Sequence, residues 1–319
     1  MTHDIVVIGA SVGGLEVLLE LVRALPKELP ASLFIVSHRP ASGDNELPDL
    51  LNSRGTLPAV QPLHGQSIER GYIYIAPPDN HLLVRQGTVD VVRGPKENGH
   101  RPAVDTLFRS AASAYGPRVI GVVLSGYQDC GTAGLMSIKA RGGIAVAQQP
   151  DTALAADMPR SAIARADVDH IVSPAELPAL LQRLIASEAG PSRSPDHVIR
   201  QLEGVVQGEH AELVCPSCSG VLTEAHAGEF EHFRCHVGHA FSLAALTRAQ
   251  DESMERALWA AVRALEESAA LSRRLSIKAV GELRRRFTES SATFAQQAET
   301  IRAVLLHGSG ALSAVVVPQ

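Results

Sequence analysis

The chain has 319 residues, of which 45% are hydrophobic, and its formal net charge is −5 with a pI of about 6.2. This length exceeds one typical domain of about 100–200 residues, so we expect two or three domains with a sizeable core. The acidic balance argues against a nucleic-acid partner, and no apolar run reaches the roughly 18 residues that membrane insertion requires. The N-terminus lacks the basic start and cleavage site of a signal peptide, which favours a cytoplasmic protein.

Short apolar runs alternate with helical patterns through residues 1–190. Strands are expected at 4–8, 32–38, 72–76, 118–125, 143–148 and 169–173, and helices at 12–25, 104–115, 131–141, 159–166 and 174–187. Buried strands that alternate with helices favour an α/β fold with a doubly wound, mostly parallel sheet. Two alternating runs around Gln86-Gly87 predict a β-hairpin inserted in that sheet or placed at its edge.

The rest of the chain changes composition three times. Residues 191–207 mix Pro, Gly, Ser and charge, which predicts a linker, and a small Cys/His module follows at 208–243. Residues 244–308 are helical in pattern, ahead of a tail at 309–319. Apolar residues spaced by three and four predict two long helices there, broken near 276–281. The same spacing fits a packed helical hairpin, a dimer seam or docking against a helical bundle such as a receptor.

A glycine-rich turn follows the first predicted strand. Residues 9–13 read GASVG and fit the G-x-S-x-G pattern of a nucleophile elbow. The glycines allow a sharp turn beside the Ser11 hydroxyl, and backbone N–H groups at the start of the next helix can stabilise an oxyanion. The alternative is a dinucleotide-binding turn, although that motif has glycine where Ser11 stands. The loop taken alone leaves both interpretations open.

Candidates for a base and an acid follow later strands. His38 ends the second strand, and the carboxyl ends of parallel strands share one edge, so His38 can meet Ser11 if their strands are neighbours. A lone histidine in such a position is also often structural. Asp129, in LSGYQDCGTAGL, is a candidate to orient His38 and equally a candidate helix N-cap.

Two further polar groups precede predicted helices. His100, Arg101 and Asp105 lie in GHRPAVDTLF, and Arg160 lies in DMPRSA. The arginines are candidates for substrate contact. Taken singly, each of these residues is more often a surface or capping residue.

Six motifs in a fixed order carry a specific resemblance. They read GASVGG, VSHRP, YIAPPDNH, HRPAVDTLF, LSGYQDCGTAGL and DMPR. Together they resemble the catalytic domain of the protein-glutamate methylesterases of bacterial chemotaxis, the CheB family, over about residues 4–187. The resemblance implies a doubly wound parallel sheet and hydrolysis of glutamate methyl esters on chemoreceptor-like proteins, often with deamidation of glutamines. It implies Ser11 as the nucleophile and His38 as the base, with no cofactor needed for the reaction.

The acid departs from the family pattern. The family acid directly precedes the glycine that matches Gly131, and Cys130 occupies that position here, with Asp129 one residue earlier. A cysteine cannot hold an imidazolium with a full negative charge, and losing the acid of a triad costs about 10⁴ in kcat. Three interpretations follow: Asp129 takes over through a small backbone shift, a Ser–His dyad works slowly, or the domain has become a binding and signalling module.

Regulation is a second departure. Family members usually carry an N-terminal phosphoacceptor domain, whereas this chain starts directly at the catalytic strand. We therefore expect any regulation to come from the C-terminal parts or from a separate partner. Besides the methylated receptor, a methyltransferase or a response regulator would be such a partner.

The hypothesis that follows is a serine esterase. Backbone N–H groups near Val12 and in the Tyr127 loop would stabilise the oxyanion, and Arg101 and Arg160 would contact the substrate. The alternatives are a non-catalytic module, supported by Cys130, and a nucleotide-binding oxidoreductase.

Three of the four cysteines crowd one short window. Cys215-x₂-Cys218, sixteen further residues and Cys235-x₃-His239 supply two knuckles with four ligands, and His236 is the alternative to His239. In a reducing cytosol this pattern favours metal over disulfides, although buried thiols without metal would also fit. Softness and geometry favour zinc, with iron as the alternative, and a closed four-ligand set would make the zinc structural. The segment resembles a zinc ribbon that accompanies methylesterase-like domains.

Overall fold

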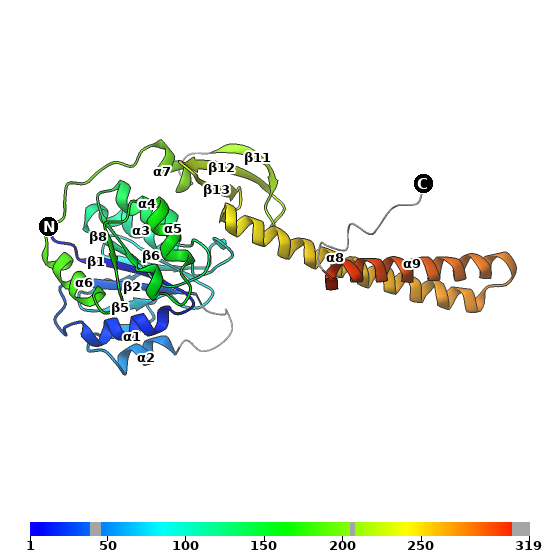
Figure 1. The fold of residues 1–319 in the computed structure, drawn as a ribbon, viewed down its shortest axis with the longest axis horizontal. Coiled ribbons are helices and arrows are strands. Elements are labelled where there is room, and N and C mark those ends of the chain that lie inside the picture. The colour runs from blue at the N-terminus through cyan, green and yellow to red at the C-terminus, as the bar shows by residue number, and fades with distance from the viewer. Residues whose placement is uncertain (39–45, 205–207, 308–319) are drawn as a thin grey trace. The chain divides into compact units, whose positions relative to one another are not determined.

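The computed structural model describes residues 1–38, 46–204 and 208–307 (Figure 1). The chain forms two compact units, Met1–Leu246 and Thr247–Gln319. The first unit holds the α/β domain and the Cys/His module, and the second holds most of a pair of long helices.

A parallel sheet of seven strands forms the centre of the first unit. Its strands are β1 (Ile5–Ala10), β2 (Ser32–Ser37), β3 (Ala59–Val60), β5 (Ile73–Ile75), β8 (Val119–Val123), β9 (Ile144–Gln148) and β10 (His170–Val172). Their order is β10-β9-β8-β1-β2-β5-β3, and every neighbouring pair runs parallel. The order reverses at β1, which is the kind of switch point where such sheets place their sites. The predicted doubly wound sheet is confirmed.

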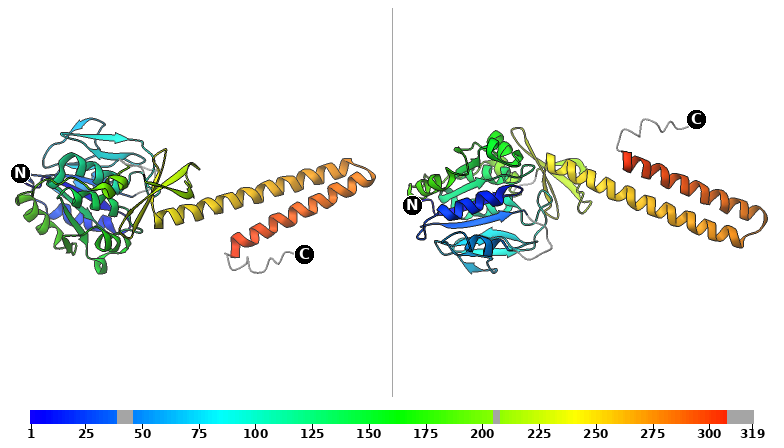
Figure 2. Two further views of the ribbon diagram at one scale, coloured as in Figure 1. Left: turned by 90° about the horizontal axis from the view of Figure 1, so that it is seen from above. Right: turned by 60° about the horizontal axis from the view of Figure 1, so that its bottom comes forward.

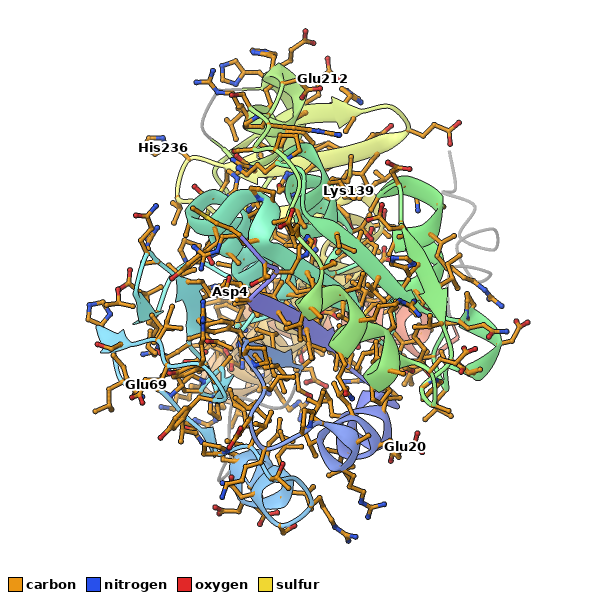
Figure 3. The ribbon with its side chains drawn as sticks, turned by 90° about the vertical axis from the view of Figure 1, so that its left-hand side faces the viewer. Asp4, Glu20, Glu69, Lys139, Glu212 and His236 are labelled. Atoms are coloured by element: carbon orange, nitrogen blue, oxygen red, sulfur yellow. The ribbon has the colours of Figure 1, made fainter. Side chains whose placement is uncertain are left out.

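Helices cover both faces of this sheet (Figure 1). One face carries α1 (Gly14–Ala24), α2 (Leu47–Asn52) and α6 (Leu177–Ala186), and the other carries α3 (Val104–Tyr115), α4 (Thr132–Ala140) and α5 (Asp157–Arg165). In Figure 3, Glu20 of α1 and Lys139 of α4 mark these opposite faces. Successive β1 residues alternate between two apolar clusters, Val6 and Ile8 facing α1 and Ile5 and Val7 facing α3. Burial on both faces explains why the strand reads as a continuous apolar run.

The hairpin around Gln86-Gly87 forms, but in a sheet of its own. β4 (Gln66–Ser67), β6 (His81–Val84) and β7 (Thr88–Val92) make a three-stranded antiparallel sheet in the order β4-β7-β6. Gly87 has φ 78°, a left-handed conformation that suits glycine in a tight turn. Two short 3₁₀ turns, Gly116–Arg118 and Pro150–Thr152, complete the α/β part.

The Cys/His module is a four-stranded antiparallel sheet. Its strands are β11 (Glu209–Val214), β12 (Val221–Ala227), β13 (Phe230–Cys235) and β14 (Ala240–Ser242), in sequential order. The segment expected as a linker contains helix α7 (His197–Leu202), and Asp196 caps it by accepting from the Ile199 N–H at 2.9 Å. Leu202 is buried in a cluster that joins α4 to the module. This segment therefore packs between α4 and the module and is more than a connecting linker.

Two long helices make up the rest. α8 (Leu243–Lys278) and α9 (Gly281–His307) run side by side as the expected helical hairpin (Figure 2). Ser291 Oγ donates to the Ala269 carbonyl at 2.9 Å, and Arg302 pairs with Glu266 across the two helices. Gly281, at φ 58°, starts α9 directly after the break that the sequence placed at 276–281. None of the described helices combines the length and apolarity that crossing a membrane would take. The expected tail at 309–319 lies outside the described residues.

Candidate active site

Ser11 lies in the elbow between β1 and α1. Its N–H donates to the Ser125 carbonyl at 2.9 Å, and its carbonyl accepts from the Gly14 N–H at 3.0 Å. Gly13 caps α1 at φ 80°, which favours glycine. A Cβ added at Gly126 would lie 2.7 Å from the Ser11 Cβ, so the close approach of the two loops also requires glycine there. The predicted strand–turn–helix context of Ser11 is confirmed.

Ser125 ties the elbow to the loops around it. Its hydroxyl donates to the Val12 carbonyl at 2.6 Å and accepts from the Ala155 N–H at 3.0 Å. The Val12 and Tyr127 side chains are exposed. Within the part of the chain that the structure describes, neither backbone N–H of these two residues has an acceptor. Both N–H groups are therefore available as hydrogen-bond donors to a ligand.

His38 stands at the neighbouring strand end. Its N–H donates to the Ala10 carbonyl at 3.0 Å, which continues the pairing of β2 with β1 and brings His38 next to the Ser11 elbow. Its ring stacks on His100, with 3.7 Å between the ring centroids and 10° between the planes. Burial, with a smaller contribution from His100, lowers the pKa of His38 well below its usual value. The resting imidazole is therefore neutral at pH 7, the form that a general base requires, although burial also weakens its affinity for a proton.

The Nε2 atom of His38 is buried and has no hydrogen-bond partner among the described residues. A buried polar atom without a hydrogen bond lowers the stability of the fold, so such an atom usually bonds to protein, water or a ligand. A serine hydroxyl or a substrate proton is what a general base would bind at this position.

Asp129 has a different partner from the expected one. Its Oδ1 accepts from the Ser242 hydroxyl at 2.7 Å, and no hydrogen bond or ion pair joins it to His38 among the residues described. Burial raises the pKa of Asp129, while the Ser242 hydrogen bond acts against that rise. The alternative that Asp129 caps α4 is wrong, because the N-cap is Gly131 at φ 104° and no side chain caps that end.

Cys130 is part of the core. Its side chain is 1% exposed and belongs to the apolar cluster that contains Val104 and Leu107. Burial raises the pKa of Cys130 well above its usual value, and the neighbouring Asp105 carboxyl adds to the rise. A neutral thiol at Cys130 cannot supply the negative charge that an imidazolium needs.

Asp105 is a buried carboxyl whose role the sequence did not reveal. It is 2% exposed, and it accepts from the Gly134 N–H at 2.7 Å and from Asn98 Nδ2 at 3.1 Å. Burial is the main reason that its pKa rises to about 6. The motif HRPAVDTLF was the only available signal, and a surface or capping role is the more common one for aspartate there.

The two candidate arginines differ in their surroundings. Arg101 is largely buried, with Nε and Nη2 donating to Asp79 Oδ1 at 2.9 and 2.6 Å and Nη1 to the Gly94 carbonyl at 2.7 Å. Arg160 is exposed on α5, with no side-chain partner in the described ranges. Arg101 is thus already engaged with the protein, whereas Arg160 is the arginine available to a ligand.

The four predicted metal ligands come together. One ligand atom from each of Cys215, Cys218, Cys235 and His239 lies within 4.8 Å of all the others. Cys218 Sγ is 3.6 Å from Cys235 Sγ, which is 3.5 Å from His239 Nδ1. This set could hold a metal ion. His236 is exposed and outside the set, and Figure 3 shows it at the surface of the module.

A serine in a strand–helix elbow at the switch point of a doubly wound sheet, with a histidine at the next strand end, defines an α/β serine hydrolase. The family model described as CheB methylesterase matches residues 6–181. The chain therefore belongs to the CheB methylesterase family, and the Cys/His module and both long helices lie beyond the matched residues.

Relatives with known names agree with this placement. A Leptospira interrogans protein, provisionally named protein-glutamate methylesterase/protein-glutamine glutaminase, is 36% identical over 185 residues, which cover 58% of this chain and 96% of that protein. Protein-glutamate methylesterase/protein-glutamine glutaminase 1 of Geobacter metallireducens is 37% identical over 184 residues, which cover 56% of this chain and 50% of that protein. This chain thus spans nearly the whole of one relative and about half of the other.

A solved structure is also similar. The crystal structure of the Thermotoga maritima CheB methylesterase catalytic domain superimposes with a TM-score of 0.55 at 33% identity, covering 58% of this chain and 100% of that one.

Proposed function

We propose that residues 1–190 form an esterase that hydrolyses glutamate methyl esters on chemoreceptor-like proteins and deamidates glutamine side chains at the same site. The observation that carries the proposal is the juxtaposition of Ser11, in its elbow, with His38, whose buried Nε2 lacks a partner among the described residues. Membership in the CheB methylesterase family and the names of the relatives supply the substrate class.

The proposed reaction is acyl transfer through the serine. Ser11 Oγ attacks the ester carbonyl while His38 takes its proton, and the Val12 and Tyr127 N–H groups stabilise the oxyanion. His38 then returns the proton to the departing methoxide, so methanol leaves and an acyl-serine remains. Water, activated by the same histidine, hydrolyses the acyl-serine to a free glutamate and restores Ser11. An amide substrate would release ammonia in place of methanol.

The supporting residues are proposed with it. Arg160, exposed on α5, would contact carboxylates of an acidic receptor helix. Arg101 would contact the substrate while it stays hydrogen-bonded to Asp79. Asp129 remains the proposed orienting acid, although its Oδ1 is bonded to Ser242. The Asp129 carboxylate keeps free lone pairs on both oxygens, so it would accept from His38 without breaking that bond.

The remaining parts complete the proposal. Residues 208–243 would bind a structural Zn²⁺ through Cys215, Cys218, Cys235 and His239, because a Cys₃His set in tetrahedral arrangement suits this ion. The ester hydrolysis itself needs no cofactor. A cytoplasmic location would give the protein access to receptor signalling domains and to a methyltransferase or response regulator.

The test is release of labelled methanol from methyl-labelled chemoreceptor. Ser11→Ala should lower the rate by at least about 10³-fold, because the covalent step is lost while the fold stays. Ser113→Ala, an exposed serine on α3, is the matched control and should release methanol like the wild type. Similar release by the Ser11 variant and the wild type would overturn the role of Ser11, and no release from the wild type would favour a binding module.

A further inference from the structure

One short strand of the Cys/His module, β14, bonds to two loops of the α/β domain that carry residues of the candidate site. The Ala240 carbonyl at the start of β14 accepts from the Asn98 N–H at 2.8 Å. At the other end of β14, the Ser242 N–H donates to Asn98 Oδ1 at 2.8 Å, and the Ser242 hydroxyl donates to Asp129 at 2.7 Å. All of these groups belong to the same compact unit.

The first contact leads to His38. Glu97 and His100 exchange two backbone hydrogen bonds, of 3.1 and 2.9 Å, around a two-residue turn in which Asn98 has φ 50° and Gly99 has φ 77°. This tight turn is followed directly by the His100 ring that stacks on His38. Because β14 pairs with Asn98, it fixes the turn that presents His100 to the proposed base.

The second contact leads to the acid loop. Ser242 is 1% exposed and Asn98 is 8% exposed, so their hydrogen bonds are shielded from water. Ser242 binds Asp129 directly, and Asn98 binds Asp105 through Nδ2 at 3.1 Å. Both carboxyls beside the family acid position are therefore tied, in one or two steps, to the same serine. Buried hydrogen-bond networks of this kind hold their members in one geometry.

Buried ion pairs fasten the module to the α/β domain at this place. Glu97 is 6% exposed and pairs with Arg109 of α3 and, at 3.5 Å, with Arg234 of β13. Although burial acts in the opposite direction, the two arginines lower the pKa of Glu97 to about 2. The segment that leads into the module is also fastened, since Arg141 Nη2 donates to Glu203 Oε2, at the end of α7, at 2.8 Å. The module is thus held as part of the unit that contains the esterase site.

The candidate metal ligands precede β14 directly. His239 is the residue before Ala240, and its carbonyl accepts from the Cys235 N–H at 2.9 Å. A bound ion would therefore fix the knuckle from which β14 starts. Without the ion, that knuckle is held by fewer contacts, since metal binding supplies much of the folding free energy of small modules.

We propose that Ser242 is a positioning residue for the esterase site, and that a metal ion bound by the four Cys/His ligands organises the site by holding β14 against Asn98 and Asp129. The inference rests on the proposed esterase function for its activity readout. It differs from that function in naming a part of the chain beyond the family domain as necessary for full activity.

A double-mutant cycle on the full chain tests the role of Ser242. Ser242→Ala should lower kcat for methanol release about 10-fold with little change in KM, and Ser242→Thr, which keeps the hydroxyl, should restore most of it. Ser242 also caps α8 through the Ala245 N–H at 3.2 Å, so loss of the cap has to be separated from loss of the Asp129 contact. In an Asp129→Ala background, Ser242→Ala should lower kcat for methanol release by less than about 2-fold. Equal losses in both backgrounds would overturn the positioning role.

Hydrogen exchange tests the metal link without relying on activity. Stripping the metal with a chelator should speed exchange at residues 97–100 and 129–132 at least about 10-fold, leave β1 protected, and be reversed by added Zn²⁺. Cys218→Ser should behave like the stripped protein, whereas His236→Ala, beside the ligand set but outside it, should behave like the wild type. Unchanged exchange on stripping would overturn the inference. A wild type that releases no methanol but shows the exchange response would instead refute only the esterase proposal.

Discussion

The loop that carries Ser11 and the loop that carries Asp129 follow neighbouring strands, β1 and β8, but different contacts hold them. The Ser11 loop is fixed by glycines, by the hydrogen bond from the Ser11 N–H to the Ser125 carbonyl and by the bond from the Ser125 hydroxyl to the Val12 carbonyl, all within the family domain. The backbone of the Asp129 loop also bonds within that domain, but the Asp129 carboxyl takes its hydrogen bond from Ser242, 113 residues further along the chain and outside the region that the family model matches.

The comparison shows how a site can change on one side only. The nucleophile side depends on a tight backbone turn that tolerates few substitutions. The GASVGG motif around Ser11 is accordingly intact. The acid side depends on which carboxyl is buried and what bonds to it. Here the thiol of Cys130 is neutral, and the carboxyls of Asp105 and Asp129 accept hydrogen bonds from Asn98 and Ser242. The Cys/His module therefore contributes a residue, Ser242, to the surroundings of Asp129.

The largest expected effect concerns stability on the acid side. Burial raises the pKa of Asp105 to about 6 from 3.8, so the folded protein keeps this proton over a range where the unfolded chain has lost it. The stabilising contribution is complete below about pH 3.8 and disappears as the pH rises through 6, a loss of about 3 kcal/mol. Asp105→Asn should therefore gain stability relative to the wild type between pH 4 and 6.

Urea unfolding at several pH values measures this difference. Asp251→Asn, which removes an exposed carboxyl on α8, should run parallel to the wild type across the same range. A parallel course for Asp105→Asn as well would mean that the folded protein does not hold the proton.

The second effect tests the rigidity of the nucleophile side. A methyl group added by Gly126→Ala would meet Met158 Sδ at 2.1 Å and Ser11 Cβ at 2.7 Å, so Ser11 or the buried Met158 has to move. Displacing a nucleophile by about 1 Å costs roughly 100-fold in kcat/KM, or about 2.7 kcal/mol at the transition state. Methanol release is the measurement, with Gly190→Ala as control, because a Cβ there meets nothing within 4 Å. If both alanine variants match the wild type, the Ser11 loop is more adaptable than its contacts indicate.

The same contrast explains what the sequence could predict. Short apolar runs predicted six of the seven strands of the central sheet, but β3 (Ala59–Val60) was missed because two residues leave no readable pattern. The spacing of Cys215, Cys218, Cys235 and His239 predicted the cluster that forms. The hairpin at 81–92 was predicted as an element, but its separate sheet was not, since alternation does not specify a partner strand.

The Ser242–Asp129 contact could not be predicted. It depends on how two separately patterned segments dock, and neither residue type differs from what an ordinary helix cap would show. Asp105 was equally hidden, because burial of an aspartate is exceptional and appears only once the packing around it is known.

The smallest expected effect asks whether the family acid can be restored. Cys130→Asp alone places a second carboxyl in the core beside Asp105, and two like charges there raise the cost of ionising either one. We expect this variant to be less stable than the wild type and to have no higher kcat for methanol release. Combined with Asp105→Asn, which removes the competing charge, Cys130→Asp should raise kcat for methanol release by about 10-fold, because a charged carboxylate then stabilises the imidazolium of His38.

The comparison of the two backgrounds is what makes this test informative. If Cys130→Asp raises kcat only in the Asp105→Asn background, the residues at positions 105 and 130 depend on each other. A rise in both would make Cys130 an isolated loss that the surroundings never accommodated. A rise in neither would mean that the acid position no longer limits the reaction, and that His38 is oriented by its stacking on His100, whose turn pairs with β14 through Asn98.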